Sequence, residues 1–185
     1  MHKYSLVFQP DTETIDWVAQ LKTDLAQKIG WYNSKNALAH ITICEFQATE
    51  QDIHRLLNQV SRCCERFAPQ EVHLNAFNTY PNGAFFLEVD LEAKAILKDY
   101  SKQIFEALPY KNMYKNTDPH LSIARKLSAD KLESAYQLFD KPEHSFKCDK
   151  IALRILNLER KQFDIIKTFD FLNLGENRNL QLPLF

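Results

Sequence analysis

Apolar residues recur along this chain with two different periods, and segments of one period alternate with segments of the other. Residues 38–46 alternate between apolar and polar positions, which is typical of a strand with one buried face, and residues 4–9 and 71–80 also resemble strands. Residues 11–30 and 49–67 place apolar residues three and four positions apart, as in an amphipathic helix. The first part of the chain therefore predicts the order β-α-β-α-β.

Capping residues mark the ends of these helices. Asp11 or Thr12 can cap the first helix, and Gly30 can end it. Thr49 and Asp52 have the spacing of a capping box at the start of the second helix.

The second part of the chain repeats this order at an offset of close to 80 residues. Strands are predicted at 84–90, 120–126 and 149–158, and helices at 91–108 and 128–140. The matching order and offset indicate that one β-α-β-α-β unit is used twice.

We expect an α+β fold built as a two-lobed duplication, with antiparallel sheets that flank a central cleft and helices outside. The lobes form a single domain, residues 1–174, in which the repeats cover about 1–80 and 81–174. A last strand at 161–174 would extend one sheet, and the turn sequence at 80–85 favours antiparallel pairing. The chain has only three glycines, and no segment resembles a flexible linker.

Composition and charge exclude several functional classes. No apolar run could cross a membrane and the start does not resemble a signal peptide, so we expect a cytoplasmic protein. The four cysteines lack metal-binding spacing and are expected as reduced thiols. Residues 1–90 hold 7 Lys/Arg and 11 Asp/Glu, whereas residues 91–185 hold 16 and 13. This balance suits a small anionic ligand better than a long duplex.

Two short motifs occupy matching places in the repeats. His40 and Thr42 lie in "HITI", and His120 and Ser122 lie in "HLSI". Residues two apart on a strand share a face, so each motif places an imidazole beside a hydroxyl with apolar residues behind. If the repeats are related by a twofold axis, both pairs face one cleft.

Two imidazoles and two hydroxyls on one phosphate suit phosphoryl transfer without a metal. One neutral imidazole takes a proton from the attacking oxygen, the other donates a proton to the leaving oxygen, and the hydroxyls steady the remaining oxygens. Chance occurrence on exposed strands is the alternative. A zinc site has less support, because no third ligand has suitable spacing.

These motifs, the repeated order and the chain length resemble the 2H phosphoesterases, which include 2′-5′ RNA ligase-like proteins and cyclic nucleotide phosphodiesterases. The resemblance extends to about residue 172. It implies a catalytic pair, His40 and His120, phosphate-holding hydroxyls on Thr42 and Ser122, and a substrate-binding Arg125, with no cofactor or metal. The residues after "HITI" are Cys-Glu-Phe, which departs from the Phe-Leu-Gly of the ligase-like branch.

The loops before the two motifs mix aromatic and basic residues. Aromatic side chains there can stack on a nucleobase, and lysines can meet phosphate. The alternative is that the aromatics pack on their own lobe and the lysines are solvated. The candidates are Trp31, Tyr32, Lys35, Tyr110, Lys111, Tyr114 and Lys115.

The last residues, 175–185, form a separate C-terminal tail. Its end, Gln181-Leu182-Pro183-Leu184-Phe185, resembles the peptide by which bacterial proteins bind the replication sliding clamp. The alternative is that these residues fold back onto their own sheet.

We therefore expect a monomeric, metal-independent enzyme that acts on RNA ends or small cyclic nucleotides. It would open 2′,3′-cyclic phosphates or cleave, and in reverse seal, 2′-5′ phosphodiesters. The alternatives are an inactive RNA-end or nucleotide binder of the same fold, and an adaptor that acts through its tail.

Overall fold

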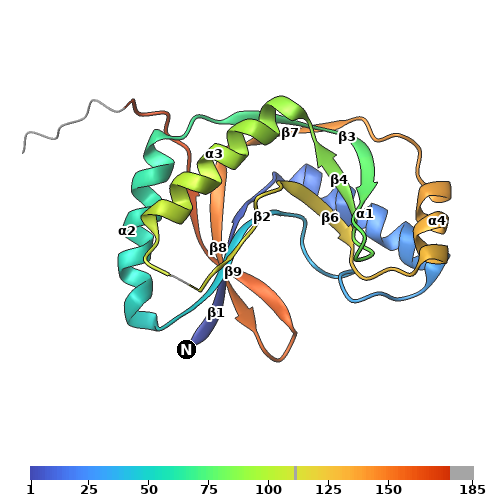
Figure 1. Cartoon of the computed structure of the whole chain (residues 1–185), viewed down its shortest axis with the longest axis horizontal. Coiled ribbons are helices and arrows are strands. Elements are labelled where there is room, and N and C mark those ends of the chain that lie inside the picture. The colour runs from blue at the N-terminus through green and yellow to red at the C-terminus, as the bar shows by residue number, and fades with distance from the viewer. Residues whose placement is uncertain (111, 176–185) are drawn as a thin grey trace, which may run out of the picture.

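The computed structural model describes residues 1–110 and 112–175. Four helices and nine strands occur among them (Figure 1). The helices are α1 (Thr12–Ile29), α2 (Glu50–Arg66), α3 (Leu91–Ala107) and α4 (Ala129–Leu138). The strands are β1 (His2–Phe8), β2 (Ile41–Ala48), β3 (Gln70–Thr79), β4 (Phe85–Val89), β5 (Tyr114–Lys115), β6 (His120–Ala124), β7 (His144–Cys148), β8 (Lys150–Asn157) and β9 (Gln162–Asp170).

The strands form one antiparallel sheet in the order β7-β3-β4-β6-β2-β1-β8-β9, and β5 pairs with β2 outside this path. This order is symmetric about the β6–β2 pair, in which Ile41 lies opposite Leu121. These two residues are 80 positions apart, which is the offset that the sequence predicts. The α+β duplication is thus confirmed, although its two half-sheets join into one sheet at this pair.

The third strand of each repeat lies in the half of the sheet that holds the first two strands of the other repeat. β3 pairs with β4 and β7, whereas β8 pairs with β1 and β9. The helices exchange in the same way, since α1 contacts α4 and α2 contacts α3. Figure 1 shows the two helix pairs at opposite ends of the molecule. The two halves of the chain are therefore interlocked.

Alternation along the strands decides which face of the sheet is covered by helices. In β1, Tyr4, Leu6 and Phe8 belong to the buried core.

Aromatic stacking joins the helices to the sheet. The Phe77 ring of β3 lies 5.2 Å from that of Phe139 at the end of α4. The opposite face of the central strands is left for polar side chains.

The predicted helix caps are present. The Asp11 side chain accepts a hydrogen bond from the Thr14 backbone N–H at 2.8 Å. Thr49 and Asp52 form both bonds of the capping box at the start of α2. These local signals therefore set where α1 and α2 begin.

Two strands are absent from the sequence prediction. The apolar pattern does not predict β7, because only two of its five side chains, Phe146 and Cys148, are fully buried. β5 has two residues, both exposed, and forms only because it lies beside β2. Two other sequence predictions, on Lys111 and on Gln181–Phe185, fall outside the described residues.

The described residues contain no helix that is long and apolar enough to span a membrane. All four cysteines are buried, and none forms a disulfide.

The turn between β3 and β4 depends on Gly83. This residue has φ +77°, and its N–H donates to the Tyr80 carbonyl at 2.9 Å. Its own carbonyl accepts from the Leu127 N–H at 2.9 Å. A Cβ at position 83 would lie 2.3 Å from the Leu127 carbonyl oxygen. The turn therefore packs tightly against the segment that follows the second motif.

We expect Gly83→Ala to destabilise the protein by about 2 kcal/mol or more, since it combines positive-φ strain with a backbone clash. Gly30→Ala is the matched control, because Gly30 has φ +80° but nothing lies within 4 Å of an added Cβ. Urea unfolding measures both changes. Equal losses of stability in the two variants would contradict the proposed clash.

Candidate active site

The two motif strands are neighbours at the centre of the sheet. The register of the β2–β6 pair sets His40 opposite Ser122 and Thr42 opposite His120. Opposing side chains in an antiparallel pair have Cβ atoms about 5 Å apart. The structure therefore gathers the four motif side chains into one group on the polar face of the sheet.

Both imidazoles are held by the same backbone contact. The Nδ1 atom of His40 lies 2.6 Å from the Leu38 carbonyl oxygen, and that of His120 lies 2.7 Å from the Asp118 carbonyl oxygen. A carbonyl oxygen only accepts, so each Nδ1 carries a hydrogen. In a neutral ring this leaves the Nε2 lone pair free to exchange a proton.

A charged carboxylate lies behind His120. The Asp118 side chain accepts a hydrogen bond from the Tyr80 hydroxyl, and Lys94 Nζ lies 2.8 Å from the other carboxylate oxygen. Burial alone raises the pKa of Asp118, but the bonds from Lys94 and Tyr80 outweigh burial and keep this pKa below its ordinary value. Asp118 is therefore an anion next to the imidazole.

This anion opposes the effect of burial on His120. Burial lowers the pKa of His120, whereas the hydrogen bond to the Asp118 carbonyl and the negative charge of Asp118 act to raise it. The net pKa remains below the ordinary value. The rings of Tyr80 and Phe86 pack against the imidazole, with centroids at 5.4 and 4.7 Å.

The buried Asn116 ties the two motifs together. Its Nδ2 donates to the Thr42 carbonyl at 2.9 Å and to the Asp118 carbonyl at 3.2 Å. Its backbone N–H donates to the Ile43 carbonyl at 2.9 Å. One side chain thus fixes the loop before β6 on β2, and with it the carbonyl that orients His120.

The charges that act on the pKa of His40 are those of cations. Lys22 from α1, Arg154 from β8 and Arg125 line the same pocket as this imidazole. Burial in the pocket wall, followed by the charge of Arg154, lowers the pKa of His40 well below its ordinary value. The hydrogen bond to Leu38 acts in the opposite direction but does not restore it. His40 therefore favours the neutral form.

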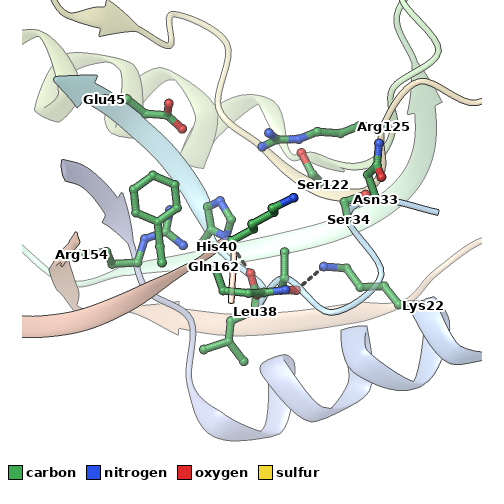
Figure 2. A pocket seen from close by; sticks show the side chains of 13 residues that line it. Lys22, Asn33, Ser34, Leu38, His40, Glu45, Ser122, Arg125, Arg154 and Gln162 are labelled. Atoms are coloured by element: carbon green, nitrogen blue, oxygen red, sulfur yellow. Dashed lines mark hydrogen bonds between the residues drawn. The ribbon is translucent and has the colours of Figure 1, made fainter. Parts of the chain in front are cut away.

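The cleft consists of two adjoining pockets that share Glu45, Ser122 and Arg125. The pocket on the His40 side holds about 210 Å³, and the pocket on the His120 side about 480 Å³. In Figure 2 the His40 ring lies between Arg154 and Ser122 in the smaller pocket. The larger pocket is also lined by Thr42, Tyr80, Asn82, Ala84, Tyr114, Asn116, Asp118 and Lys126.

The aromatic and basic candidates of the first loop do not line the cleft. The prediction for Tyr32 is wrong, because this side chain is only 4% exposed and its hydroxyl donates to the Lys22 carbonyl at 3.1 Å. Trp31 is 68% exposed but lines neither pocket. Lys35 lines a different hollow, beside α1. Other residues of this loop line the smaller pocket, namely Asn33, Ser34, Ala37 and Leu38.

The second loop contributes one aromatic residue. Tyr114 is 59% exposed and lines the larger pocket. Tyr110 instead stacks on Phe46 with a centroid distance of 4.7 Å, and Lys115 Nζ lies 5.3 Å from the ring centroid of Phe105. Both residues thus contact the protein itself, and Tyr110 packs on a residue of the first repeat instead of its own.

Several residues of the site were missed, although two of them leave a signal in the sequence. Lys22 lies four residues after Val18 and three before Leu25, on the buried face of α1. Arg154 interrupts the apolar run of β8. A charge at such a position predicts a partner or a pocket nearby. Tyr80, Asp118 and Lys94 leave no comparable signal, because loops and a different helix bring them together.

Within residues 1–110 and 112–175, no three His, Cys, Asp or Glu side chains converge as metal ligands.

Several solved structures share this fold. E. coli LigT in complex with 3′-AMP has a TM-score of 0.65 at 11% identity, covering 92% of this chain and 98% of LigT. TT0787 of Thermus thermophilus has a TM-score of 0.61 at 18% identity, covering 95% of this chain and all of that one. Usb1 of Kluyveromyces marxianus has a TM-score of 0.56 at 13% identity, covering 91% and 98%. At these identities the matches establish the fold alone.

A search of curated protein sequences gave no significant match. The family model of the 2′-5′ RNA ligase superfamily matches residues 10–159, which include both histidine motifs and most of the chain. The chain therefore belongs to the 2′-5′ RNA ligase superfamily, the 2H phosphoesterases.

Proposed function

We propose that this protein is a phosphoesterase that opens 2′,3′-cyclic phosphates, or cleaves and in reverse seals 2′-5′ phosphodiesters, at RNA ends or in small nucleotides. The observation that carries the proposal is the pair of imidazoles in one polar cleft, both with Nδ1 held by a backbone carbonyl. Cleavage of a phosphodiester without a metal requires a general base and a general acid, and two histidines can supply both.

The surroundings of the two histidines favour different roles. The cations around His40 disfavour its protonated form, which suits a general base. The Asp118 carboxylate favours the protonated form of His120, which suits a general acid. We therefore assign His40 as the base and His120 as the acid in the hydrolytic direction.

Opening of a cyclic phosphate then uses one proton transfer at each histidine. His40 Nε2 takes a proton from water as the water oxygen forms a bond to phosphorus. The bond from phosphorus to one ribose oxygen breaks, and His120 Nε2 gives its proton to that oxygen. The roles of the histidines exchange in the reverse direction.

The remaining motif residues would hold the phosphate. Thr42 and Ser122 lie on the same face as the histidines and can donate to the non-bridging oxygens. Arg125 lines both pockets, so its guanidinium can reach a phosphate from either side. These contacts strengthen as negative charge grows in the transition state.

The relatives support the ligand class. E. coli LigT is known in complexes with 3′-AMP and with phosphate, both of which carry a phosphate group. The polar cleft described above offers cations and hydroxyls suited to the same kind of ligand.

A substrate panel separates this proposal from a binder without activity. The purified protein is incubated in EDTA with 2′,3′-cyclic nucleotides and with 2′-5′ linked oligonucleotides, and the products are identified. We expect turnover of at least one class. Binding without any product would favour the inactive nucleotide-binding protein.

We expect His40→Ala and His120→Ala each to lower kcat by about 10²–10⁴-fold, because each removes one proton transfer. Thr42→Ala and Ser122→Ala should cost less, since each removes one hydrogen bond to the transition state. His73→Ala on the exposed face of β3 is the control and should keep full activity. Full activity in His120→Ala would refute the mechanism.

The two pKa shifts predict an acidic optimum. The base must be neutral and the acid protonated. As the pH increases, kcat/KM therefore rises near the pKa of His40 and falls near the pKa of His120. Both values lie below 6.5, and that of His40 lies well below it. We therefore expect a bell-shaped profile of kcat/KM with its maximum below pH 6.5. A maximum on the alkaline side of neutrality would argue against these roles.

Asp118→Asn should alter one side of this profile. Loss of the negative charge further lowers the pKa of His120, so the falling limb moves to lower pH while the rising limb stays in place. Glu133→Gln on the exposed surface of α4 is the control and should move neither limb. A parallel shift of both limbs in Asp118→Asn would show that Asp118 does not act on His120 alone.

A further inference from the structure

The smaller pocket carries more positive charge than one phosphate at the reaction centre requires. Lys22, Arg125, Arg154 and Lys161 line it, and Glu45 is its one acidic residue among the described residues. None of the four cations forms a salt bridge with a carboxylate of the described residues. We call this group the cation cluster.

Glu45 does not neutralise the cation cluster. Its carboxylate lies 2.6 Å from Nζ of Lys3, outside the cluster. Its charge favours the protonated form of Arg154, but the two side chains do not form an ion pair. Most of the positive charge in the pocket is therefore without a counter-ion from the described part of the chain.

Two members of the cluster are buried. Lys22 is 3% exposed, and its Nζ donates to the Ala37 carbonyl at 2.5 Å. Arg154 is 5% exposed, and its Nη2 donates to Ser5 Oγ at 3.1 Å. The Nε atom of Arg154 is buried and has no hydrogen-bond partner among the described residues. Buried cations of this kind destabilise a protein unless an anion joins them.

The guanidinium of Arg154 is preorganised for binding an anion. Its guanidinium carbon lies 5.1 Å from the ring centroid of Phe163, which belongs to β9 and lines the same pocket. Figure 2 shows Arg154 and Lys22 lining the hollow that also holds His40. A planar cation held against an aromatic ring loses little conformational freedom when it binds an anion.

The cation cluster lies mainly to one side of the reaction centre. Lys22, Arg154 and Lys161 line the smaller pocket but not the larger one, where His120 and Thr42 lie. The volume of about 210 Å³ is below the roughly 300–1,000 Å³ of pockets that hold a whole small molecule. The space therefore suits an anionic group of a larger ligand.

We propose that the cation cluster is a subsite for a second phosphate group of the substrate, next to the phosphate that reacts. This inference rests on the proposed function for the reacting phosphate. It makes the preferred substrate a nucleotide with two phosphates. The second phosphate has two possible sources, the 5′-phosphate of a mononucleotide or the internucleotide phosphate of an RNA end.

Three substrates distinguish these sources. They are a nucleoside 2′,3′-cyclic phosphate with a 5′-hydroxyl, the same compound with a 5′-phosphate, and a dinucleotide that ends in a cyclic phosphate. We expect kcat/KM to be about 10- to 100-fold higher for at least one compound with a second phosphate, the effect of one or more charge-assisted hydrogen bonds. Equal values for all three would overturn the proposal.

Arg154→Met and Lys22→Met remove the charge but retain an unbranched apolar side chain. Each should reduce the ratio of kcat/KM with the second phosphate to kcat/KM without it towards one, whatever the change in the overall rate. Arg160→Met is the matched control, because Arg160 is an exposed arginine of the same β8–β9 hairpin and bonds to Asp164. It should keep the wild-type preference. A preference that survives in both cluster variants would overturn the proposal.

Binding measured without turnover separates this inference from the proposed function. Titration calorimetry compares a nucleoside 3′-phosphate with the corresponding 3′,5′-bisphosphate, and a dinucleoside monophosphate with its 3′-phosphorylated form. At least one compound with two phosphates should bind the wild-type protein about 10- to 100-fold more tightly than either compound with a single phosphate. Arg154→Met should remove this difference. If the difference is found but no substrate is turned over, the proposed function fails and the subsite stands. If turnover is found but no difference exists, the subsite fails alone.

The stability of the variants provides a check on folding. Replacing a buried cation that lacks a counter-ion by an apolar side chain is neutral or stabilising in many proteins. We therefore expect Lys22→Met and Arg154→Met to keep or raise Tm in the absence of ligand. A strong drop in Tm for both would show that the charges are already paired within the protein, and would contradict an anion subsite.

Discussion

The pairing of β2 with β6 is the contact on which the candidate site depends. One register position, Ile41 opposite Leu121, joins two half-sheets and sets both histidine motifs on one face. A shift of this register by one residue would turn the histidines toward the helices. The apolar side chains behind the motifs oppose such a shift, because they are fully buried in the core. Packing on one side of the sheet thus specifies the chemistry on the other.

The symmetry of the backbone is broken by the side chains. Both histidines bond to the carbonyl two residues earlier, so their geometry is nearly the same. The charges around the two rings differ, however, because Asp118 lies beside His120 and Arg154 beside His40. Glu45 and Arg125, which are 80 positions apart, have opposite charges and line the same cleft. A duplicated unit has in this way acquired two histidines with different proton affinities.

Much of this arrangement could be predicted from the sequence, and the reasons are physical. Local signals such as the Thr49–Asp52 capping box and the period of apolar residues predict elements that form through local contacts. The offset between His40 and His120 predicts the duplication. Positions that depend on distant contacts could not be predicted. Tyr32 carries a ring suited to stacking on a base, but the packing of its loop against α1 buries it.

The exchange of strands between the halves has a consequence for synthesis of the chain. β1 leaves the ribosome well before β8, yet in the finished sheet it lies between β2 and β8. One of its edges remains without a partner until residues near 157 have been made. During that interval the nascent chain exposes unpaired backbone groups beside an apolar strand, which is the arrangement that chaperones protect and that promotes aggregation. The interlocked architecture that unites the two motifs therefore also delays completion of the sheet until β8 and β9 have been made.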